Sequence, residues 1–161
     1  MKRELKIVPD LATLSRGAAD EFSRCAREAL SARGRFTVAL SGGSTPQGTH
    51  ALIANDQNDQ KDPARRLPWE KIHIFFGDER HVPPTDKDSN FRAANESLLS
   101  KIPVPQKNVH RIPAELDATG AAAQYEDELR RVFNPKAGEW PRFDRWFAVI
   151  LRRALRSVEE P

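Results

Sequence analysis

Short apolar runs alternate with helical apolar stripes along most of this chain. Residues 36–40 (FTVAL) and 72–76 (IHIFF) are rich in apolar, β-branched and aromatic side chains, which predict buried strands. In other segments apolar residues recur every three or four positions, which is the spacing of an amphipathic helix. Strand and helix patterns therefore alternate, and they predict an α/β fold with a mainly parallel sheet and helices on both faces. Helices are expected around residues 11–30, 91–102 and 120–133 and after Pro46.

The first predicted helix has one apolar stripe, which ends before Gly34, a residue type that commonly terminates helices. Two further short strands are expected at Leu5–Val8, which Pro9 ends, and at Val109–Ile112. The polar run Asn55–Arg66 shows no periodicity and is predicted to be an exposed, mobile loop. The stripe of the first helix consists of Leu11, Leu14, Ala18, Phe22, Cys25, Ala29 and Leu30, and that of the second of Phe91, Ala94, Leu98 and Ile102. On the third helix, Tyr125, Leu129, Val132 and Phe133 are expected on one side.

The stretch around which the chain is organised is the second strand and the charged loop behind it. The strand stops at a glycine, and Asp78, Glu79 and Arg80 follow at once. Ligands of open α/β sheets bind beyond the carboxyl ends of the strands, so these charges are candidates for a site. A solvated charged turn is the alternative. Either Ser89 or Asn90 is predicted to cap the helix that follows.

A glycine-rich loop, Ser41–Pro46 (SGGSTP), lies between the first of these strands and a predicted helix. Gly42 and Gly43 allow a tight turn, Thr45 is the expected N-cap, and Pro46 suits the first helical position. Free N–H groups at such a helix start favour an anion or a polarised oxygen. The spacing differs from both the Walker A and the GxGxxG loops. An ordinary connection between a strand and a helix is the alternative interpretation.

Composition narrows the class of protein. The chain has 161 residues, enough for one domain, with 39% hydrophobic and 30% charged residues. Its net charge is +3, from 26 basic and 23 acidic residues, which is too mild to indicate nucleic-acid binding and suits a small anionic substrate. No apolar run approaches the roughly 20 residues of a membrane span. The N-terminal residues lack the apolar core of a signal peptide, so a cytoplasmic location is expected.

Cysteine and histidine offer little candidate chemistry. Cys25 is the one cysteine, so an internal disulfide is excluded, as fits a reducing cytosol. Cys25 lies on the apolar stripe and is predicted to be a packed thiol rather than a nucleophile. No pair of histidines has metal-ligand spacing, so a metal site is not expected. His73 and His110 fall in strands, His50 in a helix and His81 in the charged loop.

Two motifs resemble a known family. SGGSTP at 41–46 and FFGDERHVPPTDKDSNFRAA at 75–94 are similar to 6-phosphogluconolactonases, which group with glucosamine-6-phosphate deaminases. The resemblance extends from Leu5 to Asp144. Arg80 favours the lactonase branch, because the deaminases usually carry an aromatic residue there. The resemblance implies a Rossmann-like fold and hydrolysis of 6-phospho-D-glucono-1,5-lactone to 6-phospho-D-gluconate in the oxidative pentose phosphate pathway, without metal or organic cofactor.

The same resemblance assigns roles to residues of both motifs. Asp78 would be the catalytic residue, as a polar or proton-handling group. Arg80 would bind the anionic sugar phosphate, for which its planar guanidinium is well shaped. The first substrate-binding loop would consist of Gly42, Gly43, Ser44 and Thr45.

The chain departs from the family after Asp144. Relatives continue with an apolar strand and a loop containing Asp-Gly-His, whose histidine is the family's general base. This sequence has no Asp-Gly-His, and residues 145–161 read RWFAVILRRALRSVEEP. We therefore expect a lactonase-like domain over 1–144, with a sheet incomplete at the C-terminus, and a divergent basic tail over 145–161. The tail is either a native helix with an apolar stripe or the product of a shifted reading frame or altered splice, and the abrupt end of similarity favours the second.

Several functions remain open. The first is lactone hydrolysis. The second is a catalytically silent fragment that binds sugar phosphate weakly or interacts with another chain, and a deaminase-like enzyme is a further alternative. A nucleic-acid module rests only on the arginines after Asp144 and ranks last. The oligomeric state is left open.

Overall fold

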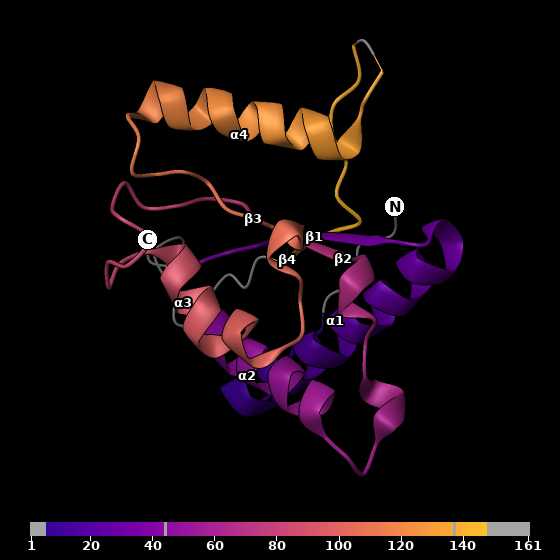
Figure 1. Ribbon diagram of the computed structural model, residues 1–161. Helices are drawn as coiled ribbons and strands as arrows, with labels where there is room; N and C mark the ends of the chain where they lie inside the picture. Colours follow the sequence, from indigo (N-terminus) through magenta and orange to yellow (C-terminus); the bar gives the residue numbers. More distant parts are fainter. Residues whose placement is uncertain (1–5, 44, 137, 148–161) are drawn as a thin grey trace, which may run out of the picture.

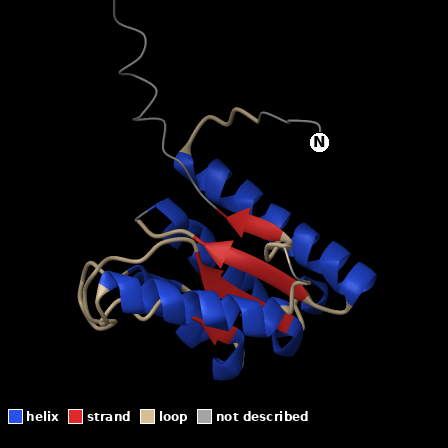
Figure 2. Cartoon of the chain, turned by 90° about the horizontal axis from the view of Figure 1, so that it is seen from above, coloured by secondary structure: helices blue, strands red, loops and turns tan. Residues whose placement is uncertain are grey.

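The computed structural model describes residues 6–43, 45–136 and 138–147. Its strands form one parallel sheet in the order β3-β2-β1-β4, in which they lie side by side (Figures 1 and 2). This arrangement confirms the predicted α/β fold. The elements are α1 (Leu11–Arg33), β1 (Phe36–Leu40), α2 (Thr45–Asn58), β2 (Ile72–Phe76), α3 (Asn90–Ser97), β3 (Val109–His110), α4 (Ala118–Phe133) and β4 (Arg145–Phe147). Short 3-10 turns occupy Pro63–Arg65, Trp69–Lys71, Leu99–Lys101 and Gln106–Asn108.

Helices cover both faces of the sheet. In Figure 1, α4 lies on the opposite side of the strands from α1, α2 and α3. Alternate strand residues such as Val38 and Ile74 join the core on the side of α1–α3. Phe75 faces the other side, where its ring packs against Phe133 of α4 and against Phe143. Period-two alternation along the strands thus supplies apolar side chains to both layers.

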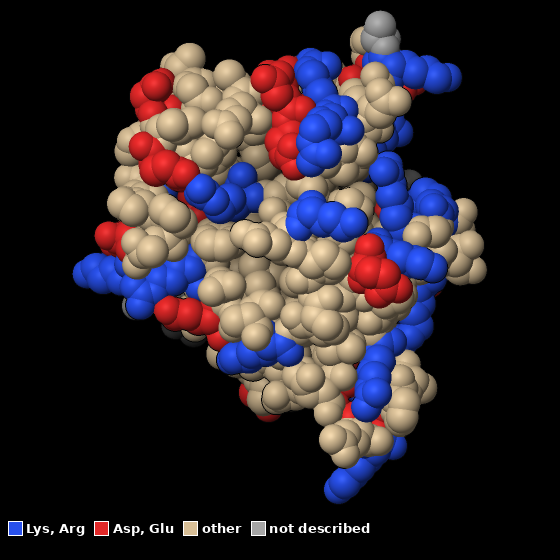
Figure 3. Space-filling view, viewed as in Figure 1, with Lys and Arg blue, Asp and Glu red and all other residues tan. Residues whose placement is uncertain are grey.

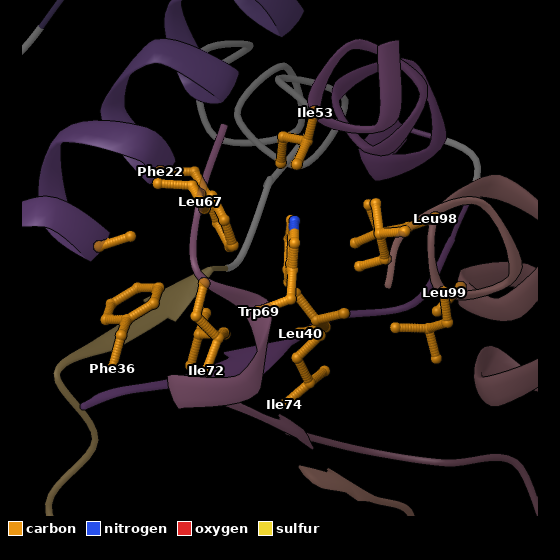
Figure 4. Packing of buried hydrophobic residues seen from close by; sticks show 14 of the residues in the cluster. Phe22, Phe36, Leu40, Ile53, Leu67, Trp69, Ile72, Ile74, Leu98 and Leu99 are labelled. Atoms are coloured by element: carbon orange, nitrogen blue, oxygen red, sulfur yellow. The ribbon is translucent and has the colours of Figure 1, made fainter. Parts of the chain in front are cut away.

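The larger core lies between the sheet and α1–α3 (Figure 4). Trp69, in the 3-10 turn that leads into β2, is 1% exposed and stacks on Phe22 of α1 with ring centroids 6.2 Å apart. The buried side of α1 is formed by Ala19, Phe22, Ala26 and Ala29. It is rotated from the predicted stripe, of which Leu11 is 54% exposed, and it includes Ala19 and Ala26, which the stripe did not. The Gly34 prediction is confirmed, since Gly34 adopts φ +72° and donates its N–H to Leu30 at the end of α1.

Two predicted segments differ in the structure. Lys6–Val8 is not a strand, and Leu5 lies outside the described residues. The edge of β1 opposite β2 pairs instead with β4, which leaves that N-terminal segment no edge of β1. Asn55–Arg66 is not wholly a loop, because α2 continues to Asn58. Its Asp56 carboxylate receives the Arg16 guanidinium of α1 at 2.6 Å, a contact that a polar pattern could not reveal.

Other boundaries are shorter than predicted. The second amphipathic helix ends at Ser97 and gives way to the 3-10 turn Leu99–Lys101. The strand expected at Val109–Ile112 retains only Val109–His110. The apolar positions still point inward, since Ala94, Leu98 and Ile102 are all buried.

Residues 145–147 form a strand, so the interpretation of the tail as a helix is wrong for this part. β4 pairs with β1 in parallel, with Val38 opposite Arg145. Asp144 starts this pairing, because its carboxylate accepts hydrogen bonds from Thr37 N (2.8 Å) and Thr37 Oγ1 (2.9 Å). The apolar spacing of the tail also suits a helix, but pairing with the open edge of β1 gives residues 145–147 the strand conformation. Residues 148–161 lie outside the described residues, and the division of the chain at Asp144 stays a prediction.

Tyr125 of α4 substitutes for a missing piece of β3. Because β3 ends opposite Phe75, it does not reach Phe76. The Tyr125 hydroxyl accepts from Phe76 N (3.1 Å) and donates to Phe76 O (2.9 Å). Burial raises the pKa of Tyr125 to about 12, so the hydroxyl keeps its proton at neutral pH. The carboxyl end of β2 is thereby fixed next to the charged loop.

Replacing Tyr125 by phenylalanine is expected to lower the free energy of unfolding by about 1–3 kcal/mol, because it leaves two backbone groups of buried Phe76 without these partners. Urea unfolding followed by far-UV circular dichroism measures this. Gln124→Ala, at an exposed neighbouring position on α4, is the control and should stay within about 0.5 kcal/mol of the parent. Equal stability of Tyr125→Phe and the parent would show that Phe76 is satisfied in another way.

Candidate functional site

The candidate site lies at the carboxyl ends of β1 and β2. The chain passes from β1 to β2 and β3 in one direction, whereas β4 lies on the other side of β1. The strand order therefore reverses beside β1, and ligands of open α/β sheets bind outside the strand ends at such a point. The loop after β1 is the glycine-rich loop, and the loop after β2 carries Asp78 and Arg80.

Both glycines of the first loop have a structural reason. Gly43 adopts φ +96°, a conformation that L side chains rarely adopt. A Cβ on Gly42 would lie 1.7 Å from Asn90 Oδ1, so no larger residue fits there without displacing Asn90. Thr45 is the first residue of α2 rather than its predicted cap, and it is 8% exposed. Ser44 lies outside the described residues.

Glu79 anchors the second loop to the start of α3. Its carboxylate faces the helix N-terminus, where free N–H groups and the helix dipole stabilise negative charge. Ser89 rather than Asn90 is the N-cap of α3, because the Ser89 Oγ accepts a hydrogen bond from Arg92 N at 3.1 Å. The groups that donate to Glu79 are Arg80 N (2.8 Å), Asn90 N (2.6 Å), Phe91 N (2.9 Å) and Ser89 Oγ (3.2 Å).

Asp78 and Arg80 are left on the surface on either side of Glu79. One carboxylate oxygen of Asp78, Oδ2, accepts from Asn90 Nδ2 at 3.1 Å. No ion pair within the described part of the chain involves the Arg80 guanidinium, so it can bind an anion. In this loop the Glu79 carboxylate is hydrogen-bonded within the protein, whereas the charged groups of Asp78 and Arg80 are exposed. A turn that is merely solvated would not need this division of roles.

Asn90 is the residue of this site that the sequence did not reveal. The sequence indicates it only as a possible helix cap, yet it is 4% exposed and bridges the two loops. Its Nδ2 reaches both Asp78 Oδ2 and Asp78 O, and its Oδ1 side abuts Gly42. Its place next to the cap of a helix at this sheet edge was the only available sign.

A second polar cluster lies on the α4 side of the sheet. His73 Nδ1 and His110 Nε2 are 3.0 Å apart, and His110 Nδ1 contacts Glu128 Oε1 at 2.6 Å. Burial lowers the pKa of both histidines. Hydrogen bonds from Arg131 and then from His110 lower the pKa of Glu128 to about 2, against the effect of burial. The cluster attaches α4 to β2 and β3.

The single cysteine is accounted for by packing. Cys25 is half-buried against the core, and burial raises the pKa of its thiol, in keeping with the prediction that it is not a nucleophile.

Neither a metal cluster nor a membrane helix is found in the described part of the chain. Within residues 6–43, 45–136 and 138–147, no group of three or more His, Cys, Asp and Glu side chains could hold a metal ion. None of the described helices is long and apolar enough to cross a membrane.

Charges on the surface are mixed. Figure 3 shows Lys and Arg interspersed with Asp and Glu on the face that it presents. Of the arginines on which the nucleic-acid hypothesis rested, Arg145 forms an ion pair with Glu21 of α1. The later arginines lie outside the described residues.

Comparison with known proteins supports the sequence resemblance. Residues 9–148 match the family described as glucosamine-6-phosphate isomerases/6-phosphogluconolactonase. A 6-phosphogluconolactonase of Nostoc sp. is 40% identical over 146 residues, which cover 89% of this chain and 57% of that protein. One of Synechocystis sp. is 41% identical over 118 residues, covering 73% of this chain and 45% of that protein. The chain thus spans about half the length of these curated relatives.

A solved structure agrees. The crystal structure of 6-phosphogluconolactonase from Thermotoga maritima superposes with a TM-score of 0.68 at 29% identity, over 79% of this chain and 53% of that chain. The family match over residues 9–148 includes β4. The chain therefore belongs to the glucosamine-6-phosphate isomerase/6-phosphogluconolactonase family.

Proposed function

We propose that this chain serves the hydrolysis of 6-phospho-D-glucono-1,5-lactone to 6-phospho-D-gluconate and that it binds the sugar phosphate at the ends of β1 and β2. The observation that carries the proposal is the contact of Asp78, in the loop after β2, with Asn90, which in turn abuts Gly42 in the loop after β1. The loop after β1 borders the point between β1 and β4 where the strand order reverses. The lactonase names of the relatives favour this reaction over deamination. The cytoplasmic location and the absence of nucleic-acid or membrane partners stay predictions from the sequence.

Each residue has a proposed role in binding. The backbone at Gly43 can approach an anionic or polarised oxygen closely, because the space beside this glycine is open. Gly42 would contribute its backbone to the same loop, while its missing Cβ leaves room for Asn90. The Arg80 guanidinium would pair with the phosphate, to which it can donate two parallel hydrogen bonds. Asp78 would contact the sugar as a polar or proton-handling group. Thr45 would contribute mainly through its place in the first turn of α2, since it is largely buried.

Lactone hydrolysis places two demands on the protein. Water attacks the carbonyl carbon while a base takes its proton, and the ring C–O bond then breaks as the ring oxygen gains a proton. Donors must also stabilise the oxyanion that develops on the carbonyl oxygen. The base that the resemblance implies, a histidine in Asp-Gly-His, is absent from this sequence. For this reason the second candidate is a catalytically silent chain, which binds sugar phosphate weakly or interacts with another chain.

Binding and turnover separate the two candidates. Calorimetry with 6-phosphogluconate, the stable product, measures binding by the purified chain, and lactone loss above the spontaneous rate measures turnover. We expect turnover at least about 10²–10⁴-fold below that of a full-length relative, the usual loss without a general base. Near-normal turnover would refute the silent chain. Tighter binding of glucosamine 6-phosphate than of 6-phosphogluconate would indicate the deaminase branch instead.

Arg80→Ala should weaken 6-phosphogluconate binding by about 10–100-fold, the usual effect of losing a hydrogen bond to a charged group. Lys87→Ala is the matched control, since Lys87 is an exposed cation of the same loop, and it should bind like the parent. Equal losses in both variants would mean that general charge attraction, not Arg80, holds the phosphate. Failure of the parent chain to bind any sugar phosphate would overturn the placement of the site.

A further inference from the structure

Asn90 connects two loops that come from different strands. Its side chain is almost fully buried, although it belongs to the first residue of α3. Its backbone N–H is held by Glu79 Oε1 at 2.6 Å, so the position of its Cα is fixed from the β2 side. From there the side chain extends between the Asp78 carboxylate and the backbone of Gly42.

The orientation of the Asn90 amide follows from its partners. Asp78 O and Asp78 Oδ2 are both acceptors, at 3.2 and 3.1 Å, so the atom that they share must be the donor Nδ2. Oδ1 consequently faces Gly42. The amide holds the Asp78 side chain to its own backbone, which selects one conformation of an otherwise exposed carboxylate.

We propose that Asn90 is a positioning residue that couples the glycine-rich loop to the Asp78 carboxylate. The inference rests on the proposed function, because the loops it joins are the proposed substrate-binding elements. Gly42 contributes to the same coupling, since any side chain at this position would displace the Asn90 amide from Asp78. A sugar phosphate bound to the glycine-rich loop then meets Asp78 in a fixed position.

A double-mutant cycle tests this coupling. The parent, Asn90→Ala, Asp78→Ala and the double variant are compared by calorimetry with 6-phosphogluconate. Asn90→Ala alone should weaken binding about 10-fold, the effect of a hydrogen bond to a charged group. In the Asp78→Ala background the same change should weaken it less than about 2-fold, because the group positioned by Asn90 is gone. An equal loss in both backgrounds would show a structural role and overturn the inference.

Asn90→Asp separates hydrogen-bond donation from packing. Aspartate has nearly the same shape but places an acceptor beside Asp78, so it should bind at least as weakly as Asn90→Ala. Binding like that of the parent would mean that Asn90 only fills space. Thermal melts by circular dichroism establish that each variant is folded before its affinity is compared.

A measurement without ligand keeps the inference testable if the proposed function fails. In ¹H–¹⁵N spectra, Asp78→Ala should shift the Gly42 and Gly43 amide signals, and it should no longer do so when Asn90 is already alanine. Shifts that persist in the Asn90→Ala background would overturn the coupling. Absence of 6-phosphogluconate binding by the parent together with the expected shifts would overturn the function and leave the coupling intact.

Discussion

Trp69→Ala is expected to lower the free energy of unfolding by about 3–5 kcal/mol, the largest effect of any single substitution considered for this chain. Trp69 is 1% exposed and fills the centre of the core between β2 and the helices α1 and α2 (Figure 4). Its ring stacks on Phe22 of α1, so truncation removes this contact and leaves a cavity in the core. Urea unfolding followed by far-UV circular dichroism gives the free energy.

Trp69→Phe is the matched variant. The indole Nε1 is buried and has no hydrogen-bond partner within the described residues, so its removal sacrifices no hydrogen bond. We expect a loss below about 2 kcal/mol, because most of the ring remains. If both variants lost the same stability, the indole nitrogen would have to be satisfied, and the cavity argument would fail.

His50 is expected to make the protein less stable as the pH falls from about 6.5 to about 4. His50 on α2 is 3% exposed, and its Nδ1 lies 2.9 Å from Ser97 Oγ. That hydroxyl already donates to Ala93 O, so His50 donates through Nδ1–H and its Nε2 is unprotonated. Nε2 has no partner among the described residues, and burial lowers the pKa of His50 to about 4.

The sign follows from proton uptake. Below pH 6.5 the unfolded chain binds a proton at His50 that the folded chain refuses until about pH 4, so acid favours unfolding. The effect reaches about 3 kcal/mol at pH 4, of which about 2 kcal/mol appears between pH 7 and 5. Stability is fully retained above the unfolded value.

Urea unfolding at pH 7 and pH 5 in parent and His50→Asn measures this contribution. Asparagine can keep the donor to Ser97 but does not titrate. The loss of stability between the two pH values should shrink by about 2 kcal/mol in the variant. A smaller dependence in the same direction should remain, because burial also lowers the pKa of His73 and His110. An unchanged dependence would show that His50 is not the buried proton acceptor.

Elements with strong local patterns were predictable from sequence. β1 and β2 were located to the residue because each is a largely apolar run followed by a glycine or by a loop rich in glycine and hydroxyl residues. Gly34 ended α1 as predicted because its left-handed conformation is a property of the residue itself. β4 was missed because Arg145–Phe147 carries an apolar spacing that also suits a helix. Only the free edge of β1 selects the strand.

The candidate site shows the same division. The glycine-rich loop and the pair Asp78 and Arg80 could be found by residue type and by their place after a strand. In the sequence Glu79 cannot be distinguished from its two charged neighbours. In the structure its carboxylate accepts hydrogen bonds from Asn90 N and Phe91 N at the start of α3. Asn90 could not be recognised, since its partners Asp78 and Gly42 come from two different strand ends.

Local periodicity and turn chemistry were thus enough for the fold class, the principal strands and the two loops of the site, because these depend on neighbours along the chain. Tertiary contacts decided that β4 pairs with β1 and that the Glu79 carboxylate is bound to the N-terminus of α3. They also decided that Asn90 lies between the two loops. The physical reason is that burial and hydrogen bonding assign each polar side chain to one set of partners. Those partners are separated along the sequence and meet only when β1, β2 and α3 are packed together.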